Sequence, residues 1–180
     1  IEPSSTPENA NARDFWRTRQ AGFRLDGKAG GDRFRLQGSV RDSVTGDHFM
    51  MPTPQGRTPF LPVNPANELA YLLGRWDHVA DGGVTHSVQA YVEHSDMDIV
   101  IAREQRTTFD IEYQQQQGLG ERVHVMWGAG WRHKRDEVVG GAPRFPSQFT
   151  SPRDRSDLLH LFAQGEFHLV PERWALTPGA

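Results

Sequence analysis

The sequence has no cysteine, no long apolar run and no excess of positive charge. Without cysteine, disulfides, thiolate catalysis and cysteine-ligated metal sites are excluded. No stretch approaches the roughly 20 consecutive apolar residues that a membrane helix needs, and the mean hydropathy is low at -0.65. The net charge of -3 over 180 residues, with scattered basic residues, provides no basic footprint for nucleic acid. We therefore expect neither a membrane-spanning helix nor a nucleic-acid partner.

What the chain does contain is a repeated alternation of apolar and polar residues. Segment 159–169 is the clearest case, because Leu159, Leu161, Ala163, Gly165, Phe167 and Leu169 interleave with mostly polar residues. A period of two is typical of a β-strand with one apolar face. The pattern predicts strands over 15–28, 33–41, 69–79, 85–95, 106–116, 123–132 and 159–169, with an eighth beginning in 173–179.

The links between these strands are expected to alternate in length. Short links with Gly or Pro lie at 29–32, 80–83, 117–120 and 170–172, and longer ones at 42–68, 95–105 and 134–157. Short turns on one side and long loops on the other are typical of outer-membrane barrels. The predicted fold class is all-β: an antiparallel up-and-down meander forming seven to eight strands of the wall of a large transmembrane β-barrel. A soluble small-ligand-binding barrel or sandwich would also alternate.

A barrel wall has a lumen side and a lipid side, and the alternation assigns residues to each. The predicted lumen-facing residues are Arg24, Arg35, Arg75, Gln89, Glu93, Asp110, Glu112 and Arg132, which we expect to form cross-strand charge pairs. Trp76, Trp127, Trp131 and Trp174 are predicted girdle aromatics at the lipid headgroups. Gly128 and Gly130 fall on the lumen side, where small residues are expected to leave space for a plug or loop.

Several motifs carry a resemblance to a known family. They are GFRLD at 22–26, YLLGRW at 71–76 followed by VQAY at 88–91, TFDIEY at 108–113, WGAGWR at 127–132, and FAQGE at 162–166 leading to LVPER at 169–173. In these motifs, their order and their spacing, the chain resembles the β-barrel of bacterial TonB-dependent outer-membrane receptors. Gly165 stands where the family usually has Asp in its Phe-x-Gln-Asp-Glu run.

The resemblance implies a function and a larger protein. It implies energy-dependent, TonB-coupled uptake of a bulky nutrient at the bacterial outer membrane, most often a ferric siderophore, by binding and gating. Such receptors have a plug domain, a TonB-contact segment and a barrel of about 22 strands. We therefore expect 1–14 to be a polar lead-in and 15–180 a partial barrel truncated at both ends. Its expected partners are the lipid bilayer, lipopolysaccharide, its own plug, TonB and a ferric chelate.

Ligand contacts in this family come from external loops and the plug apex. In the longest predicted loop, the candidate contacts are His48, Phe49, Met50, Met51, Arg57 and Phe60, because aromatic and Arg-bearing loops suit anionic aromatic chelates. We expect no enzyme activity, cofactor or metal site. The catalytic alternative is a β-sheet hydrolase with Asp110 and Glu112 as its acid pair, whose turnover would be lost on Glu112→Gln.

Overall fold

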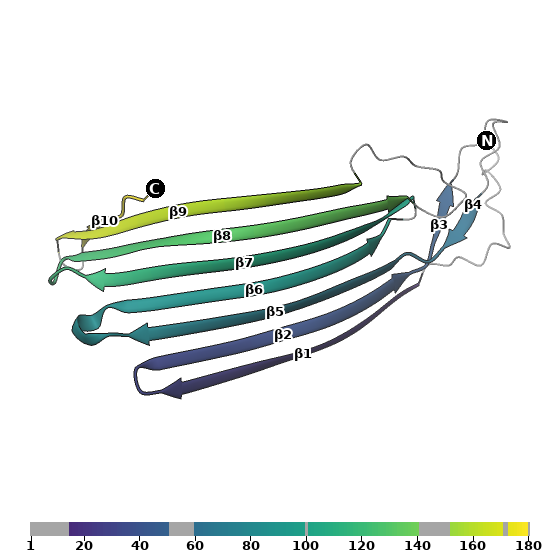
Figure 1. Cartoon of the computed structure of the whole chain (residues 1–180). Coiled ribbons are helices and arrows are strands. Elements are labelled where there is room, and N and C mark those ends of the chain that lie inside the picture. Colours follow the sequence, from purple (N-terminus) through teal and green to yellow (C-terminus); the bar gives the residue numbers. More distant parts are fainter. Residues whose placement is uncertain (1–14, 51–59, 100, 141–151, 171–172, 180) are drawn as a thin grey trace.

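The computed structural model describes residues 15–50, 60–99, 101–140, 152–170 and 173–179, and these residues form β-sheet (Figure 1). One antiparallel sheet has the strand order β1-β2-β5-β6-β7-β8-β9-β10, and β3 and β4 form a separate hairpin. The strands are β1 (Trp16–Ala29), β2 (Asp32–Thr45), β3 (Asp47–Met50), β4 (Phe60–Val63), β5 (Ala66–Val79), β6 (Thr85–Asp98), β7 (Ala102–Gly118), β8 (Val123–Gly140), β9 (Arg153–Val170) and β10 (Trp174–Leu176). The predicted all-β antiparallel meander is confirmed.

The two ends of the main sheet differ. At the end on the left of Figure 1, here called the turn end, short links join β1 to β2, β5 to β6, β7 to β8 and β9 to β10. Gly30 and Gly120 lie in two of these turns with φ angles of 58° and 75°. Only glycine adopts this conformation without steric cost, which explains why the short links are rich in it. The opposite end, which carries the β3–β4 hairpin, is here called the loop end.

The loop end departs from the predicted boundaries. The strands continue past the apolar alternation, so the predicted 95–105 link was wrong: β6 runs to Asp98 and β7 starts at Ala102. The 134–157 link was also overestimated, since β8 runs to Gly140 and β9 starts at Arg153. Cross-strand ion pairs such as Arg103 with Asp96, at 2.6 Å, replace apolar contacts there. Strand pairing does not require an apolar face, because the backbone ladder forms regardless of it.

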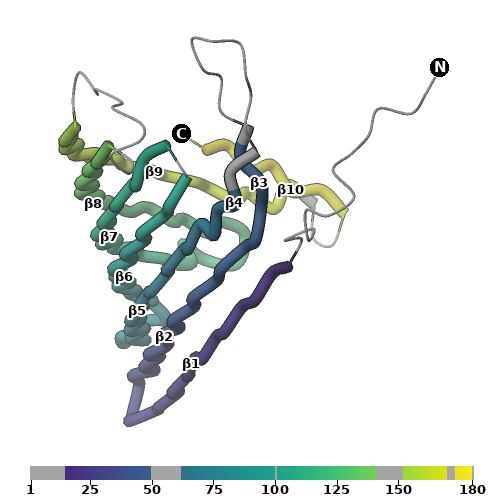
Figure 2. Tube along the Cα trace, turned by 90° about the vertical axis from the view of Figure 1, so that its right-hand side faces the viewer, coloured from purple at the N-terminus to yellow at the C-terminus, as the bar shows by residue number. Residues whose placement is uncertain are grey.

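The sheet is a curved, twisted single layer, as the view along it shows (Figure 2). Ala102 is the one buried apolar residue among the described residues, whereas large apolar side chains such as Leu25, Leu161 and Leu169 are exposed. A soluble sandwich would cover such side chains with a second sheet. No helix in the described part of the chain is long and apolar enough to cross a membrane.

The registers divide the sheet into two faces. Pairing places Arg24, Gln37, Leu73, Tyr91, Asp110, Arg132 and Leu158 in one cross-strand row, and Phe23, Gly38, Leu72, Val92, Phe109, His133 and Asp157 in the next. Because side chains alternate between faces, the first row and every second row beyond it lie on what we call the polar face. The other rows lie on the apolar face.

Candidate functional site

The polar face holds all eight residues predicted to face the lumen. Arg24, Asp110 and Arg132 share one row, Arg35, Arg75, Gln89 and Glu112 share a second, and Glu93 lies in a third beside Tyr71 and Thr108. The register therefore aligns on one face residues from six strands that are distant in sequence. Their role as lumen residues stays a prediction.

Ion pairs on this face follow the predicted cross-strand pattern in part. Arg132 Nε donates to Asp110 Oδ2 at 2.8 Å between directly paired positions. Asp26 accepts from Arg35 across the strand pair at 3.1 Å, and also from Arg24 of its own strand at 2.6 Å. Asp110 is buried with 6% exposure, whereas the Asp26 side chain is 51% exposed. Only the first pair is shielded from water enough for its loss to matter much.

The inward glycines have a different role from the one predicted. An added Cβ on Gly130 would meet the ring of His160, and one on Gly128 would meet the ring of Phe162 and the backbone oxygen of Tyr113. Both rings belong to β9 residues paired directly with these glycines. The glycines therefore do not leave open space for a plug, because aromatic rings from the next strand already lie over them.

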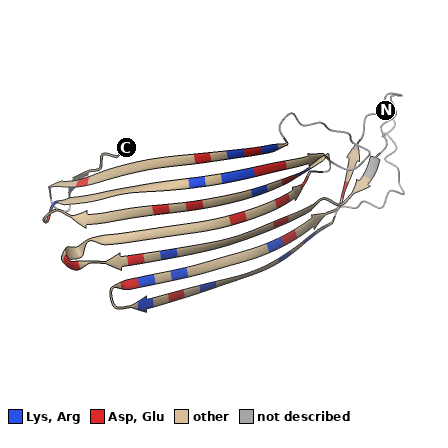
Figure 3. Ribbon diagram, viewed as in Figure 1, with Lys and Arg blue, Asp and Glu red and all other residues tan. Residues whose placement is uncertain are grey.

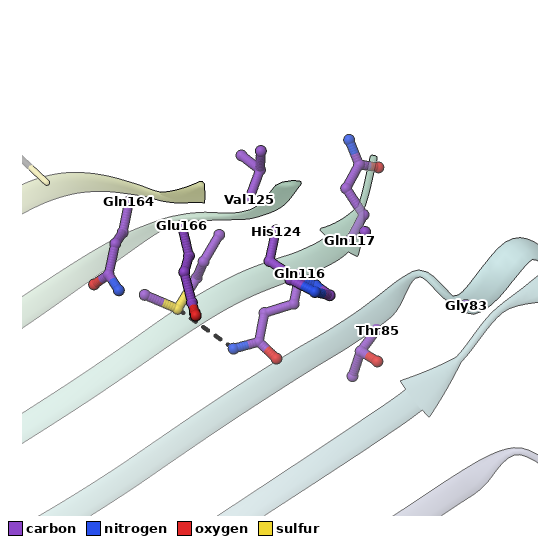
Figure 4. A pocket seen from close by; sticks show the side chains of 10 residues that line it. Gly83, Thr85, Gln116, Gln117, His124, Val125, Gln164 and Glu166 are labelled. Carbon is purple, nitrogen blue, oxygen red and sulfur yellow. Dashed lines mark hydrogen bonds between the residues drawn. The ribbon is translucent and has the colours of Figure 1, made fainter. Parts of the chain in front are cut away.

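A hollow of about 340 Å³ lies on the polar face at the turn end of β6 to β9 (Figure 4). Gln116, Gln164 and Glu166 point to one side of the sheet in this view, while Val125 and Gln117 point to the other, as the alternation requires. Gln116 Nε2 lies 3.5 Å from the Met126 sulfur. The lining is polar and mostly uncharged, so this hollow suits water or neutral groups.

The apolar face ends in tryptophans at both edges of its apolar rows. On the apolar face of β5, Trp76 is the last apolar residue before the turn end, and its Nε1 donates to Asp32 at 2.9 Å. On the same face of β8, Trp131 ends the unbroken run of apolar residues from Val123, before His133, and its Nε1 donates to Asp157 at 3.0 Å. A ring with one apolar and one polar neighbour matches the chemistry of a membrane interface.

The other two predicted girdle residues differ from this pair. Trp127 lies on the apolar face at 41% exposure, with its ring edge against Tyr113 at a centroid distance of 5.6 Å. Trp174 is 69% exposed and pairs with Val170, next to a register shift in β10. The girdle role of all four tryptophans stays a prediction.

Histidines extend the aromatic edge at the turn end, which sequence reasoning missed. The rings of Trp76, His78, His86 and Tyr113 stack in succession with centroids 5.7, 6.3 and 6.1 Å apart. His78 Nδ1 lies 2.8 Å from Asp32, and His86 Nδ1 lies 2.8 Å from the Tyr113 hydroxyl. The strand register needed to bring these rings together is not visible in any one segment. The placement of His78 and His86 on either side of one short turn was the available signal.

The predicted ligand residues lie only partly within the described chain. His48 and Phe49 belong to β3 and pair with Pro62 and Leu61 of β4 at the loop end. Met50 and Phe60 pair with one another in the same hairpin. Met51 and Arg57 lie outside the described residues. The hairpin gathers four of the six candidates, and their ligand role stays a prediction.

Charged residues gather at the loop end of β8 and β9 (Figure 3), and the register places some of them, such as Arg135 and Arg155, on the apolar face beyond its apolar rows. Asp96 lies on this face of β6, four rows beyond Val92, and accepts two hydrogen bonds of 2.6 Å from Arg103 and one of 2.8 Å from Gln105. The hydrogen bonds from Arg103 hold the pKa of the Asp96 carboxyl below its ordinary value. These contacts stabilise strand pairing outside the apolar rows.

The described residues contain no group of three or more His, Asp or Glu side chains that could hold a metal ion. The two carboxylates of the hydrolase alternative are each engaged: Asp110 accepts from Arg132 at 2.8 Å, and Glu112 lies 3.4 Å from His160 Nε2. They share the polar face but have different partners.

Two solved receptors resemble this chain in three dimensions. The alcaligin outer membrane receptor FauA from Bordetella pertussis aligns over 91% of this chain, with a TM-score of 0.58 and 16% sequence identity. The siderophore receptor PirA from Pseudomonas aeruginosa aligns over 94%, with a TM-score of 0.54 and 17% identity. The chain therefore shares the fold of part of each of these two structures.

The likeness covers part of each receptor. The chain spans 27% of the FauA chain and 34% of the PirA chain. No protein-family model and no curated protein matches the sequence. The fold therefore rests on three-dimensional likeness, and it agrees with the predicted partial wall of a large transmembrane barrel.

Proposed function

We propose that this chain forms part of the barrel wall of a bacterial outer-membrane receptor that takes up a ferric siderophore through coupling to TonB. In this proposal residues 15–180 are one segment of a longer barrel, and residues 1–14 lead into it. The receptor binds and transports its ligand and catalyses no reaction. A plug domain and a TonB-contact segment would belong to other parts of the protein.

One observation carries the proposal: an uncovered apolar face, edged by tryptophans, lies opposite a charged face in a wall shaped like those of two siderophore receptors. Exposure of this apolar surface to water would be unfavourable, whereas its contact with lipid would be favourable. The charged face suits a water-filled or plugged lumen. A soluble ligand-binding barrel would instead have its apolar side chains inside.

The loop end suits the external side of the membrane. It carries the β3–β4 hairpin, whose His48 and Phe49 are candidate ligand contacts together with Met50, Met51, Arg57 and Phe60. On the apolar face, Arg135 and Arg155 are directly paired four rows beyond Trp131 and Leu159. Two facing guanidinium groups just outside an apolar band suit the phosphates of lipopolysaccharide.

The test compares two substitutions on one strand, made in the gene that contains this chain. Ile111 lies on the apolar face and Gln114 on the polar face of β7. Arginine costs about 2–4 kcal/mol at the lipid-facing middle of a barrel and much less in the lumen. We expect Ile111→Arg to reduce the protein recovered in the outer membrane and Gln114→Arg to leave it unchanged.

Uptake is measured in the same strains. A strain lacking the gene should lose ⁵⁵Fe uptake from at least one of a hydroxamate, a catecholate and a carboxylate ferric chelate. Wild type and Gln114→Arg should restore it, and Ile111→Arg should not. Outer-membrane recovery with unchanged uptake of all three chelates would contradict siderophore transport, and recovery in the soluble fraction would contradict the barrel wall itself.

A further inference from the structure

Like charges face one another on the polar face at the turn end of β1, β2 and β5. Lys28 is paired directly with Arg33 across β1 and β2, and Arg35 is paired directly with Arg75 across β2 and β5. Like charges in directly opposed positions destabilise a sheet. Two such pairs side by side leave a repulsion that carboxylates of the sheet or a bound anion must compensate.

Two carboxylates neutralise part of this charge. Arg35 Nε donates to Asp26 at 3.1 Å, and Arg75 Nε donates to Asp77 at 3.0 Å. Asp77 also accepts a 2.6 Å hydrogen bond from Ser87. Four cations against two carboxylates give these six residues a net charge of two positive units, and Asp26 is also shared with a fifth cation, Arg24, which donates to it at 2.6 Å.

The excess charge lies mainly on Lys28 and Arg33, of which Arg33 also interacts with the charge of Asp77 across the strand pair. Neither forms a salt bridge among the described residues. Arg33 lies directly across from Asp77, whose carboxylate is already hydrogen-bonded to Arg75 and Ser87. The two side chains therefore keep donors available for an incoming anion.

The cluster lines a hollow of about 520 Å³ whose walls include Lys28, Arg33, Arg35 and Arg75 together with Asp26 and Asp77. Pockets of 300–1,000 Å³ are the usual size for small ligands. A neighbouring hollow, lined by uncharged glutamines and containing Thr85 and Gln116 in common with this one, has no such cationic lining. Charge and space thus coincide at one place on this face.

We propose that this hollow is a binding site for a small anion with two or more carboxylates. A carboxylate can accept two parallel hydrogen bonds from a planar guanidinium, and a second carboxylate can reach the Lys28 ammonium. Such a ligand supplies the two negative units that the cluster lacks. Binding here is separate from the uptake proposed above, since it can be assayed without a membrane or iron.

The probe is citrate, titrated calorimetrically into the purified full-length protein that contains this chain, in a non-ionic detergent at low ionic strength. The test variant is Lys28→Gln/Arg33→Gln, which leaves the ion pairs of Asp26 and Asp77 in place. We expect it to weaken citrate binding about ten-fold or more, because two charged hydrogen-bond donors are lost. Acetate, with one carboxylate, should bind much more weakly than citrate, and added sodium chloride should weaken citrate binding.

The matched control is Arg17→Gln/Arg19→Gln. It removes the same number of positive charges as the test variant. Both come from β1, at positions whose alternation places them on the opposite face from Lys28. We expect it to bind citrate like wild type. Equal weakening by both double variants would overturn the site in favour of general electrostatics, and so would absence of citrate binding to the wild type.

An acidic hexapeptide is titrated in parallel to test a protein segment as the occupant. Binding of the peptide without binding of citrate would overturn the small-anion site. Circular dichroism reports whether each variant keeps its strand content. If the double variant Lys28→Gln/Arg33→Gln loses strand content, the single variant Arg33→Gln is used in its place. Unchanged citrate affinity in that single variant would equally overturn the proposal.

Discussion

The polar face changes character from one side of the sheet to the other along the same cross-strand rows. On β1, β2 and β5 the row through Lys28, Arg33 and Asp77 is fully charged. On β8 and β9 the same row ends in Gly128 and Phe162. The first side is open to solvent and suited to ions, whereas the second is closed by rings lying over glycines.

Alternation therefore assigns a residue to a face of the sheet but does not determine the chemistry of that face. Both sides obey the same period of two, and both are polar by position. What separates them is whether the neighbouring strand supplies a charge or a ring. A contact therefore contributes more to stability where it is packed than where it is exposed, because water screens exposed charges.

The largest effect should come from filling the packed side. Gly128→Ala places a Cβ against the backbone oxygen of Tyr113 as well as the Phe162 ring, so the strands themselves must move apart. Overpacking of this kind costs about 1–3 kcal/mol. We expect the free energy of unfolding, measured by urea titration in detergent micelles, to fall by an amount near the upper end of that range.

Gly74→Ala is the matched control. Gly74 is also in a strand, β5, but nothing lies within 4 Å of the position its Cβ would take. Its substitution should change the free energy of unfolding little or raise it slightly, since glycine is entropically costly in a strand. Equal losses in the two variants would mean that the rings do not close the β8–β9 side.

A smaller effect should come from removing one member of an ion pair on each side. Arg132→Ala leaves the buried Asp110 carboxylate without its cross-strand partner and should cost about 1–2 kcal/mol, since Arg132 itself is half exposed and partly screened. Arg24→Ala removes a donor from the exposed Asp26, which keeps Arg35 as a partner. We expect it to leave the urea midpoint unchanged.

Both substitutions remove an arginine from the polar face, so general loss of charge cannot separate them. A shift of the midpoint in Arg24→Ala as large as in Arg132→Ala would show that exposure does not distinguish the two sides. Double variants with Asp110→Asn and Asp26→Asn would then measure each pair directly.

Sequence reasoning reached the fold because alternation over segments such as 159–169 is a local signal. It predicted strand ends too early at the loop end, where apolar residues such as Met97 are out of phase with the alternation of β6 and the strands are held by pairs such as Arg103 with Asp96. It also misread Gly130, because the ring of His160 is brought over it by a register that no single segment reveals. The anion hollow was missed for the same reason, since Arg75 is distant from Lys28 in sequence.

The smallest effect should appear at the loop end, where a shielded carboxylate extends the comparison to pH. Hydrogen bonds from Arg103 lower the pKa of Asp96 in the folded chain. A carboxyl with a lowered pKa stabilises the fold above its unfolded pKa of about 4 and loses that contribution as the pH falls further. Wild type should therefore lose more stability than Asp96→Asn between neutral pH and about pH 3.

Urea midpoints at the two pH values measure this difference, and all other carboxyls are common to both proteins. Asp26→Asn is the exposed counterpart, because the Asp26 carboxylate also accepts hydrogen bonds from two arginines but is half exposed. We expect the change in urea midpoint of Asp26→Asn between the two pH values to be closer to the wild-type change than that of Asp96→Asn is. If Asp26→Asn differed from wild type more than Asp96→Asn does, burial of Asp96 would contribute nothing to strand pairing. The ion pairs at the loop end would then be as weakly stabilising as those around Asp26.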